Sequence, residues 1–368
     1  MKRILVITPF FYPHVGGSER YMEELYVFLK GKHANIRVDV LCYNTDNVKE
    51  QEKYKGLNIY RIPCWTLLKD QFCLPKPLAL FKFLKSHNSY NLVHSSTRFF
   101  DSSWWAPLYA KLIKSKVVLT DHCAFHPASN NRFINMMSKL IEMTIVRFSL
   151  HFYDEIYSES KSTREFLKKT FKVNSQLAYP GVGYIPDSLR LKDSDKKIKV
   201  VYVGRMIESK GVKMIFDIAR EIPEADFVLA GGGSLVGKLK ERVISERLRN
   251  VFIPGNLLRN EVSRLLKSAD IFVYPSWHSE GLPLALIEAG SYGLPVVATD
   301  TGGVREVIVS KRTGILTKQK DYESFKSALY KLIKNNSLRE KLGRNLKVLV
   351  SKKFSWQGAS SLIIKEVQ

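Results

Sequence analysis

Cysteine is scarce in this sequence. The 368 residues include only four cysteines, Cys42, Cys64, Cys73 and Cys123, and no two of them form a C-x-x-C pair. Four cysteines are too few to build the disulfide framework of a small secreted scaffold. The sequence therefore excludes that class of protein, and we expect a protein of the cytoplasm, where thiols stay reduced.

Long apolar runs and repeats are also missing. The nearest approach to the roughly eighteen apolar residues of a spanning helix is 282–299, which is interrupted by Glu288, glycines and prolines. The N-terminal "MKRILVITPFFYP" has an apolar run of only about five residues, shorter than a signal peptide requires, and predicts a strand. We find no low-complexity tract or fixed-period repeat, which argues against disorder or a solenoid.

Acidic residues are outnumbered by basic ones. The 58 lysines and arginines exceed the 35 acids, giving a net charge of +23, and the excess is spread over both halves. Such a surface attracts anions, including nucleotide phosphates, anionic lipid headgroups and nucleic acid. A general basic bias without a function is an open alternative. Nucleic-acid binding is the weakest of these interpretations, because the charge forms no stripe and no recognition motif is present.

The order of predicted elements indicates two α/β domains. The length exceeds one typical hydrophobic core, and short β-branched runs alternate with helical stretches, which is typical of parallel sheets with crossover helices. We expect two Rossmann-like domains with a cleft between them, residues 1–185 and 198–352, joined by a polar linker at 186–197. The runs that predict strands are 3–8, 36–43, 91–96, 116–121 and 154–160 in the first series, then 198–204, 225–231, 269–275 and 294–300 in the second.

Two acids flank the helix start in "HSEGLPLALIEAGSYG" (278–293). Glu280 precedes the predicted helix and Glu288 lies inside it, so the two are roughly 12 Å apart or somewhat less. That is too far for both to act on one atom, but it suits the two ends of an extended ligand with sugar hydroxyls. The alternative is that Glu280 favours the helix dipole and Glu288 is a solvated surface residue.

Other predicted strand ends carry cations and glycines. Arg205 and Lys210 follow the strand in "VYVGRMIESKGV" and are suited to hold a diphosphate. Gly232 belongs to the turn "LAGGGSLVG", and Gly16 and Gly17 precede a predicted helix in "PHVGGSERY". Each glycine turn alone is a weak signal, because glycine is common in ordinary turns.

Together these stretches resemble glycosyltransferase family 4, retaining enzymes of the GT-B architecture. The resemblance extends from about residue 4 to 356, through "PFFYPHVGGSER", "VVLTDHC", "VGRMIESKGV", "VLAGGGS", "ADIFVYPSWHSEGLPLALIEAGSYGLPVVATDTGG" and "FSW". It implies a hexosyltransferase that moves a sugar from a nucleoside-diphosphate donor to an acceptor hydroxyl. It also implies that the last segment, 353–368, is a helix that crosses back to the N-terminal domain.

The resemblance assigns roles to matching positions. Glu288 matches the residue that binds the ribose hydroxyls, Glu280 the residue beside the transferred sugar, and His122 a histidine near the reacting sugar. Arg205 and Lys210 match the diphosphate clamp, and with Glu280 and His122 they form the predicted catalytic set. The donor would also contact the first-domain loop of Gly16 and Gly17, the turn of Gly232, and the backbone of Gly281, Leu282 and Leu284. The sequence departs from the common Gly-Phe-Gly after the first glutamate, with Gly281-Leu282-Pro283 instead.

The partners follow from the same resemblance. We expect a nucleotide sugar as co-substrate and no cofactor. Asp193-Ser194-Asp195 has the Asp-x-Asp pattern of metal-dependent transferases, but it lies among lysines of the linker, so we expect no metal. The acceptor would be a carbohydrate or a lipid-linked molecule. Residues 131–150 allow two interpretations, a surface that lies on the anionic inner face of a membrane or a mostly buried helix. A sugar-nucleotide epimerase or a non-catalytic protein of the same fold is the alternative to a transferase.

Overall fold

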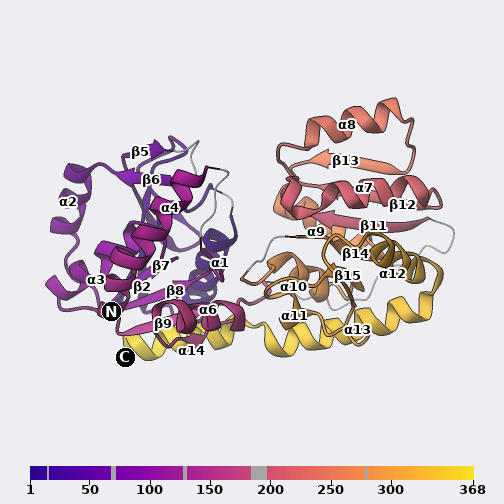
Figure 1. The fold of residues 1–368 in the computed structure, drawn as a ribbon. Coiled ribbons are helices and arrows are strands. Elements are labelled where there is room, and N and C mark those ends of the chain that lie inside the picture. The colour runs from indigo at the N-terminus through magenta and orange to yellow at the C-terminus, as the bar shows by residue number, and fades with distance from the viewer. Residues whose placement is uncertain (15, 68–71, 127–130, 184–196, 278–280) are drawn as a thin grey trace. The chain divides into compact units, whose positions relative to one another are not determined.

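The structure is a computed structural model that describes residues 1–14, 16–67, 72–126, 131–183, 197–277 and 281–368 (Figure 1). The chain forms two compact units. Unit 1 comprises Met1–Gly181 and Ser355–Gln368, and unit 2 comprises Val182–Phe354. The expected linker at 186–197 lies outside the described residues except for Lys197, as do Asp193, Asp195 and Glu280.

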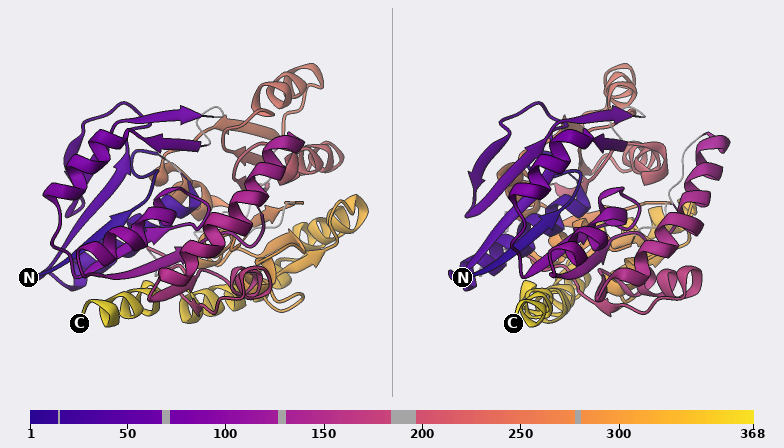
Figure 2. Two further views of the ribbon diagram at one scale, coloured as in Figure 1. Left: turned by 60° about the vertical axis from the view of Figure 1, so that its left-hand side comes forward. Right: turned by 90° about the vertical axis from the view of Figure 1, so that its left-hand side faces the viewer.

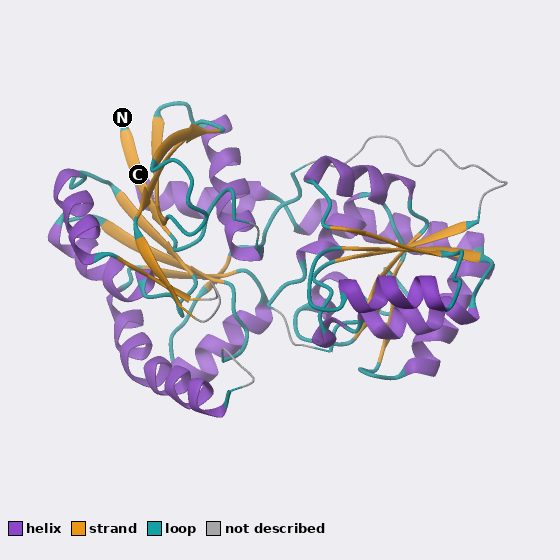
Figure 3. Ribbon diagram, turned by 90° about the horizontal axis from the view of Figure 1, so that it is seen from above, coloured by secondary structure: helices purple, strands orange, loops and turns teal. Residues whose placement is uncertain are grey.

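Unit 1 is built on an eight-stranded sheet in the order β10-β9-β8-β7-β1-β2-β4-β3. All neighbouring strands in it are parallel except β3 and β4. Helices cover the sheet on its two faces, and the central strands β1 and β7 are mostly or entirely buried (Figure 3). The strands are β1 (Lys2–Ile7), β2 (Ile36–Tyr43), β3 (Gln51–Tyr54), β4 (Leu57–Ile62), β7 (Leu92–Ser96), β8 (Lys116–Asp121), β9 (Glu155–Ser158) and β10 (Gln176–Leu177), with a separate antiparallel pair β5 (Cys64–Leu67) and β6 (Phe72–Pro75).

The helices of unit 1 include one from the far end of the chain. They are α1 (Gly17–Lys32), α2 (Pro77–Ser86), α3 (Ser102–Leu112), α4 (Arg132–Ile141), the π-helical turn η1 (Glu142–Val146), α5 (Arg147–Ser149), the 3₁₀ turn η2 (Leu150–Phe152), α6 (Lys161–Phe171) and α14 (Trp356–Val367). Helix α14 packs against α1 and shares its core. The two ends of the chain are therefore adjacent, with Lys2 Nζ donating to the carbonyl of Gln368 at 3.2 Å (Figure 2).

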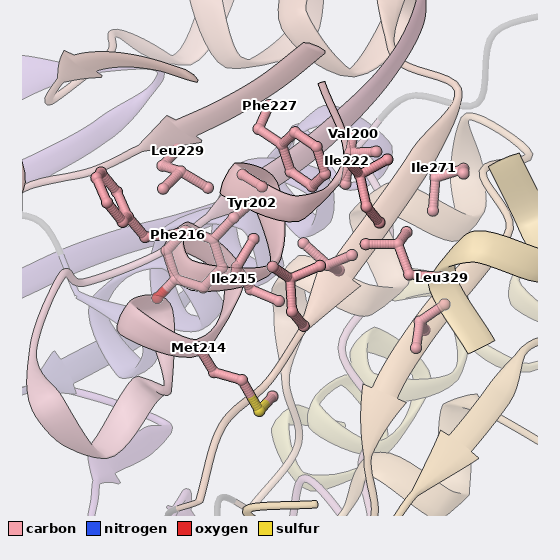
Figure 4. Close-up of a cluster of buried hydrophobic side chains, with 14 of the residues drawn as sticks. Val200, Tyr202, Met214, Ile215, Phe216, Ile222, Phe227, Leu229, Ile271 and Leu329 are labelled. Carbon is pink, nitrogen blue, oxygen red and sulfur yellow. The ribbon is translucent and has the colours of Figure 1, made fainter. Parts of the chain in front are cut away.

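Unit 2 has a six-stranded parallel sheet in the order β13-β12-β11-β14-β15-β16. Its strands are β11 (Ile198–Val203), β12 (Ala225–Ala230), β13 (Val251–Gly255), β14 (Ile271–Tyr274), β15 (Val296–Thr299) and β16 (Ile315–Thr317). Its helices are η3 (Glu208–Lys210), α7 (Val212–Glu221), α8 (Val236–Ser245), α9 (Arg259–Ser268), α10 (Leu284–Ser291), α11 (Val304–Val307), α12 (Tyr322–Lys334) and α13 (Asn336–Lys353). Apolar side chains of β11, β12, α7 and α12 form one buried cluster between sheet and helices, with Phe216 and Phe227 fully buried (Figure 4).

Strand order reverses once in each sheet. In unit 1 the chain proceeds outward from β1 through β2 to one edge and from β7 through β8 to the other, and in unit 2 it does the same from β11 and from β14. Open parallel sheets bind ligands at the carboxyl ends of strands where the order reverses. The topology thus singles out the loops after β1 and β7 in unit 1 and after β11 and β14 in unit 2.

Within the parts of the chain that are described, no helix is both long and apolar enough to span a bilayer.

Candidate functional site

The loop after β11 places Arg205 and Lys210 where the strand order of unit 2 reverses. Arg205 is exposed, and Lys210 is half-buried in the short 3₁₀ turn η3. Tyr202 Oη donates to the carbonyl of Arg205 at 2.8 Å, and the backbone N–H of Met206 donates to the carbonyl of Gly232 at 2.6 Å. The loop that carries Arg205 and Lys210, here called the cation loop, is thereby joined to the loop of Gly231, Gly232 and Gly233 after the neighbouring strand β12, here called the glycine loop.

Close backbone contact explains the glycines of this second loop. Gly231 has φ +140°, and a Cβ at this position would collide with the carbonyl of Gly204. A Cβ at Gly232 would approach Asn256 Oδ1 to 2.6 Å, well inside van der Waals contact. Gly231 is therefore required for packing on the β11 loop, Gly232 is confined by the side chain of Asn256, and a donor contact at Gly232 stays a prediction.

The environment of Lys210 disfavours its charged form. Burial and the nearby charge of Arg205 lower the pKa of Lys210 to about 7. Its ammonium lies 6.0 Å from the ring centroid of Tyr274, on the adjacent strand β14. Two cations held near each other at a partly desolvated strand end interact unfavourably, and a doubly negative ligand between them would relieve that cost.

The turn from β14 to α10 joins the same edge. A Cβ at Gly211, where φ is +69°, would collide with the carbonyl of Pro275, and the N–H of Trp277 donates to the carbonyl of Ser209 at 2.8 Å. The loop containing Lys210 is therefore packed on the end of β14. These contacts bring the cation loop, the glycine loop and the start of this turn to one edge of unit 2.

Helix α10 begins at that turn. Gly281 and Leu282 are buried, and Leu284 is the first helical residue after Pro283. The first N–H groups of a helix have no intrahelical acceptor and carry partial positive charge, which favours an anion. Glu288 is half-buried on the same helix. Because Glu280 is outside the described residues, the spacing of the two glutamates stays a prediction.

Gly303 was not anticipated from the sequence. It follows β15, and a Cβ on it would collide with the carbonyl of Gly281. Since its φ of −73° is ordinary, the requirement for glycine here is steric. The paired glycines of "DTGG" indicate a tight turn, but the sequence does not show that Gly303 contacts Gly281.

Unit 1 places His122 directly after β8. Its Nδ1 lies 2.8 Å from Glu159 Oε2, and both side chains are more than nine-tenths buried. Within the described residues, His122 Nε2 is buried without a hydrogen-bond partner. If the carboxylate accepts the proton of Nδ1, then Nε2 carries a lone pair available to a ligand. Glu159, which ends the strand region of β9, was not singled out in the sequence.

Helix α1 brings the glycine loop of unit 1 toward the same histidine. Tyr21 of α1 stacks edge to face on the His122 ring at 4.7 Å between centroids. Gly16 is the N-cap of α1, and a Cβ on it would collide with the carboxylate of Glu19. A Cβ on Gly17 would meet open space, so no contact in the described structure requires glycine there.

His94 and His126 behave as structural residues. His94 is fully buried between the Tyr26 hydroxyl at 2.6 Å and Thr120 Oγ1 at 2.7 Å, and burial lowers its pKa to about 3. His126 pairs with the buried carboxylate of Glu142. Among the described side chains, no three His, Cys, Asp or Glu residues are grouped to hold a metal ion.

Two family models match consecutive parts of the chain. Residues 15–182 match "Glycosyltransferase Family 4", and residues 188–348 match "Glycosyl transferases group 1". A glycosyltransferase of Methanocaldococcus jannaschii is 27% identical over 97% of this chain and 96% of its own length. The GPI3 subunit of phosphatidylinositol N-acetylglucosaminyltransferase from Saccharomyces cerevisiae is 23% identical over 98% of this chain and 82% of its own length.

Solved structures share the fold. The sucrose-phosphate synthase of Thermosynechococcus elongatus superimposes with a TM-score of 0.77 at 19% identity over 99% of this chain and 98% of its own. HepE of Anabaena, in complex with UDP, gives a TM-score of 0.76 at 15% identity over 99% of both chains. At such identities the likeness concerns the fold, two Rossmann-like domains in the GT-B arrangement. Both halves of the sequence match, and the chain is therefore a GT-B glycosyltransferase that belongs to glycosyltransferase family 4.

Proposed function

We propose that this glycosyltransferase moves a hexose-type sugar from a nucleoside-diphosphate donor to an acceptor hydroxyl with the anomeric configuration retained. The observation that carries the proposal is the edge of unit 2 where strand order reverses. There Arg205, Lys210 with its lowered pKa, the glycine loop of Gly232 and the start of α10 converge. A diphosphate is the ligand whose charge fits two cations and a helix start.

In the proposed complex each group has one task. Arg205 and Lys210 bind the diphosphate and stabilise the charge that develops on it as the sugar leaves. The backbone of Gly281, Leu282 and Leu284 faces sugar and phosphate. Glu288 accepts hydrogen bonds from the ribose hydroxyls, and Glu280 does the same for the transferred sugar. UDP is the first nucleotide to test, because HepE binds it.

The proposed reaction needs no protein nucleophile. The bond between the anomeric carbon and the phosphate oxygen breaks, the bond to the acceptor oxygen forms on the same face, and the acceptor proton passes to the departing phosphate oxygen. His122 lies near the reacting sugar in this proposal, and the loop of Gly16 and Gly17 closes on the donor. The protein contributes positioning, charge stabilisation and exclusion of water from the reacting groups.

We propose a carbohydrate or lipid-linked acceptor and no metal cofactor. The yeast relative is named for a transfer to phosphatidylinositol, which supports a lipid-linked acceptor in this chain. The cations of unit 2 supply the charge that a divalent metal supplies elsewhere.

A donor screen tests the proposal. The purified protein is incubated with nucleotide sugars, and thermal stabilisation and slow release of free sugar are recorded, with NMR giving the anomer first released. We expect one donor to stabilise the protein and to yield sugar of the donor's own configuration. Return of the nucleotide sugar with an inverted hydroxyl would instead identify an epimerase, and inverted anomeric configuration in the released sugar would contradict retention.

Glu288→Gln separates binding from chemistry. We expect it to weaken donor affinity while turnover at saturating donor stays close to that of the wild type, because its task is to hold the ribose. Normal affinity with collapsed turnover would show that this assignment is wrong.

A further inference from the structure

One helical segment of unit 1 exposes many large apolar side chains. Residues 132–152 run through α4, η1, α5 and η2 along the outside of the unit, beside α3 (Figure 1). Eight large apolar side chains in it are between 37% and 69% exposed, which we call the apolar row: Phe133, Met136, Met137, Leu140, Met143, Ile145, Phe148 and Phe152. The interpretation of 131–150 as a mostly buried helix is therefore wrong.

The π-helical turn keeps the apolar row on one face. Leu140 precedes the π-helical turn and Ile145 lies within it, five residues later, which is the i to i+5 hydrogen-bond spacing of a π-helix. The opposite face, with Ser138, Glu142 and Val146, is buried against the unit. With a regular α-helical repeat, Ile145 would rotate toward the buried side. The local geometry thus makes one amphipathic surface from two short helical pieces.

The exposed charges of the segment have a single sign. Arg132, Lys139 and Arg147 are exposed, while Glu142, the segment's one acid, is buried. Arg132 and Lys139 are seven residues apart, or two helical turns, and Arg147 follows eight later across the π turn. These spacings align the three cations along one edge of the apolar row.

The segment is held firmly against the sheet. Asn131 Oδ1 accepts the N–H of Phe133 at 2.9 Å and caps α4. Inside, the buried Arg98 pairs with Glu142 at 3.1 Å and with Asp121, the last residue of β8. The surface is therefore fixed to the strand end that carries His122.

We propose that the apolar row docks on the surface of an anionic lipid bilayer, with its aromatic and methionine side chains in the interface and the three cations against lipid phosphates. An exposed apolar stripe beside a basic edge is the composition of interfacial helices. Lipid phosphate fits better than a second copy of the chain, because the same segment of a second copy would offer the three cations no exposed acid to pair with. The inference does not depend on the proposed donor or reaction.

Vesicle sedimentation tests the docking surface. The full chain is mixed with phosphatidylcholine vesicles with or without phosphatidylglycerol, at about 0.1 M and about 1 M salt, between which the Debye length falls from about 10 Å to about 3 Å. One variant is Phe133→Ser/Phe148→Ser and another is Lys139→Glu/Arg147→Glu. The matched control, Ile244→Ser/Val348→Ser, removes exposed apolar side chains of unit 2.

We expect the wild type and the control to bind anionic vesicles at low salt, and both row variants to bind at least tenfold more weakly. Binding of the row variants at wild-type strength would overturn the proposal. The proposal would also be overturned if the wild type did not bind vesicles and instead sedimented as a dimer, and if Phe133→Ser/Phe148→Ser converted that dimer to a monomer. Thermal stabilisation by UDP, measured on every variant, reports the donor site separately and is expected to stay unchanged.

Discussion

Protonation of Lys210 links donor affinity to pH. The pKa of free Lys210 is about 7, lowered by burial and by Arg205, and a bound diphosphate would raise it. Binding then takes up a proton whenever pH exceeds 7, so we expect affinity to fall by up to tenfold per pH unit above that point. Calorimetry with a nucleotide sugar checks this, because its doubly esterified diphosphate does not titrate there. In Lys210→Met the decline should vanish, and an equal decline in that variant would assign it to another group.

If His122 lies beside the reacting sugar as proposed, Glu159 would act on the reaction through it. Its carboxylate, 2.8 Å from His122 Nδ1, fixes the ring and its tautomer. We expect Glu159→Gln to lower kcat about 10- to 100-fold with little change in the donor KM. Glu165→Gln, at an exposed position of α6, is the control. If Glu159→Gln lowered only the melting temperature while kcat stayed normal, the residue would be structural.

At the scale of elements, the contact between the loop after β15 and the turn before α10 fixes the position of the proposed donor site. Gly303→Ala would push against the carbonyl of Gly281 and displace the helix start. We therefore expect weaker donor binding together with a lower melting temperature. Gly237→Ala, a helical position whose Cβ meets open space, should instead stabilise the protein by up to about 1 kcal/mol. Unchanged donor affinity in Gly303→Ala would show that the turn does not face the ligand.

Elements whose pattern is local were predictable from the sequence. The buried runs at β1, β2 and β8 and the helix α1 after Gly16 and Gly17 lie where the sequence predicts them. The antiparallel pairs β3–β4 and β5–β6 were not identified, although each joins strands that are adjacent in the sequence, because these strands are short and β3, with the sequence QEKY, has no apolar alternation. The π-helical turn at Glu142 was not predicted either. It accompanies the burial of this acid beside Arg98, a partner 44 residues earlier in the sequence.

For the site, positions could be predicted from the sequence, but few contacts could. Arg205 and Lys210 could be found because charged residues directly after a parallel strand gather at one edge of the sheet. The pairing of His122 with Glu159 joins two different strand ends, and the sequence contains no mark of it. The same holds for the collision between Gly303 and Gly281.

At the scale of the whole molecule, the last helix completes the first unit. Trp356 of α14 is 4% exposed, stacks edge to face on Tyr21 at 5.1 Å and donates from Nε1 to Glu24 Oε2 at 3.3 Å. We expect Trp356→Ala to destabilise unit 1 by about 3–5 kcal/mol. Hydrogen exchange should show the loss of protection in α1 and β1 while β11 and β14 keep theirs. Uniform loss in both units would mean that they unfold together.

The central claim is that the edge of unit 2 marked by Arg205 and Lys210 binds the diphosphate of a sugar nucleotide. The most direct measurement is the dissociation constant of UDP, or of the nucleotide that the donor screen selects. It is measured for the double variant Arg205→Ala/Lys210→Ala and for the control Lys213→Ala. Lys213 is a half-exposed lysine on the neighbouring helix, paired with Glu208 at 2.7 Å. Loss of two charge-assisted contacts, each about 1.5–3 kcal/mol, predicts at least a hundredfold weaker binding in the double variant. Lys213→Ala should bind like the wild type, and wild-type affinity in the double variant would contradict the account.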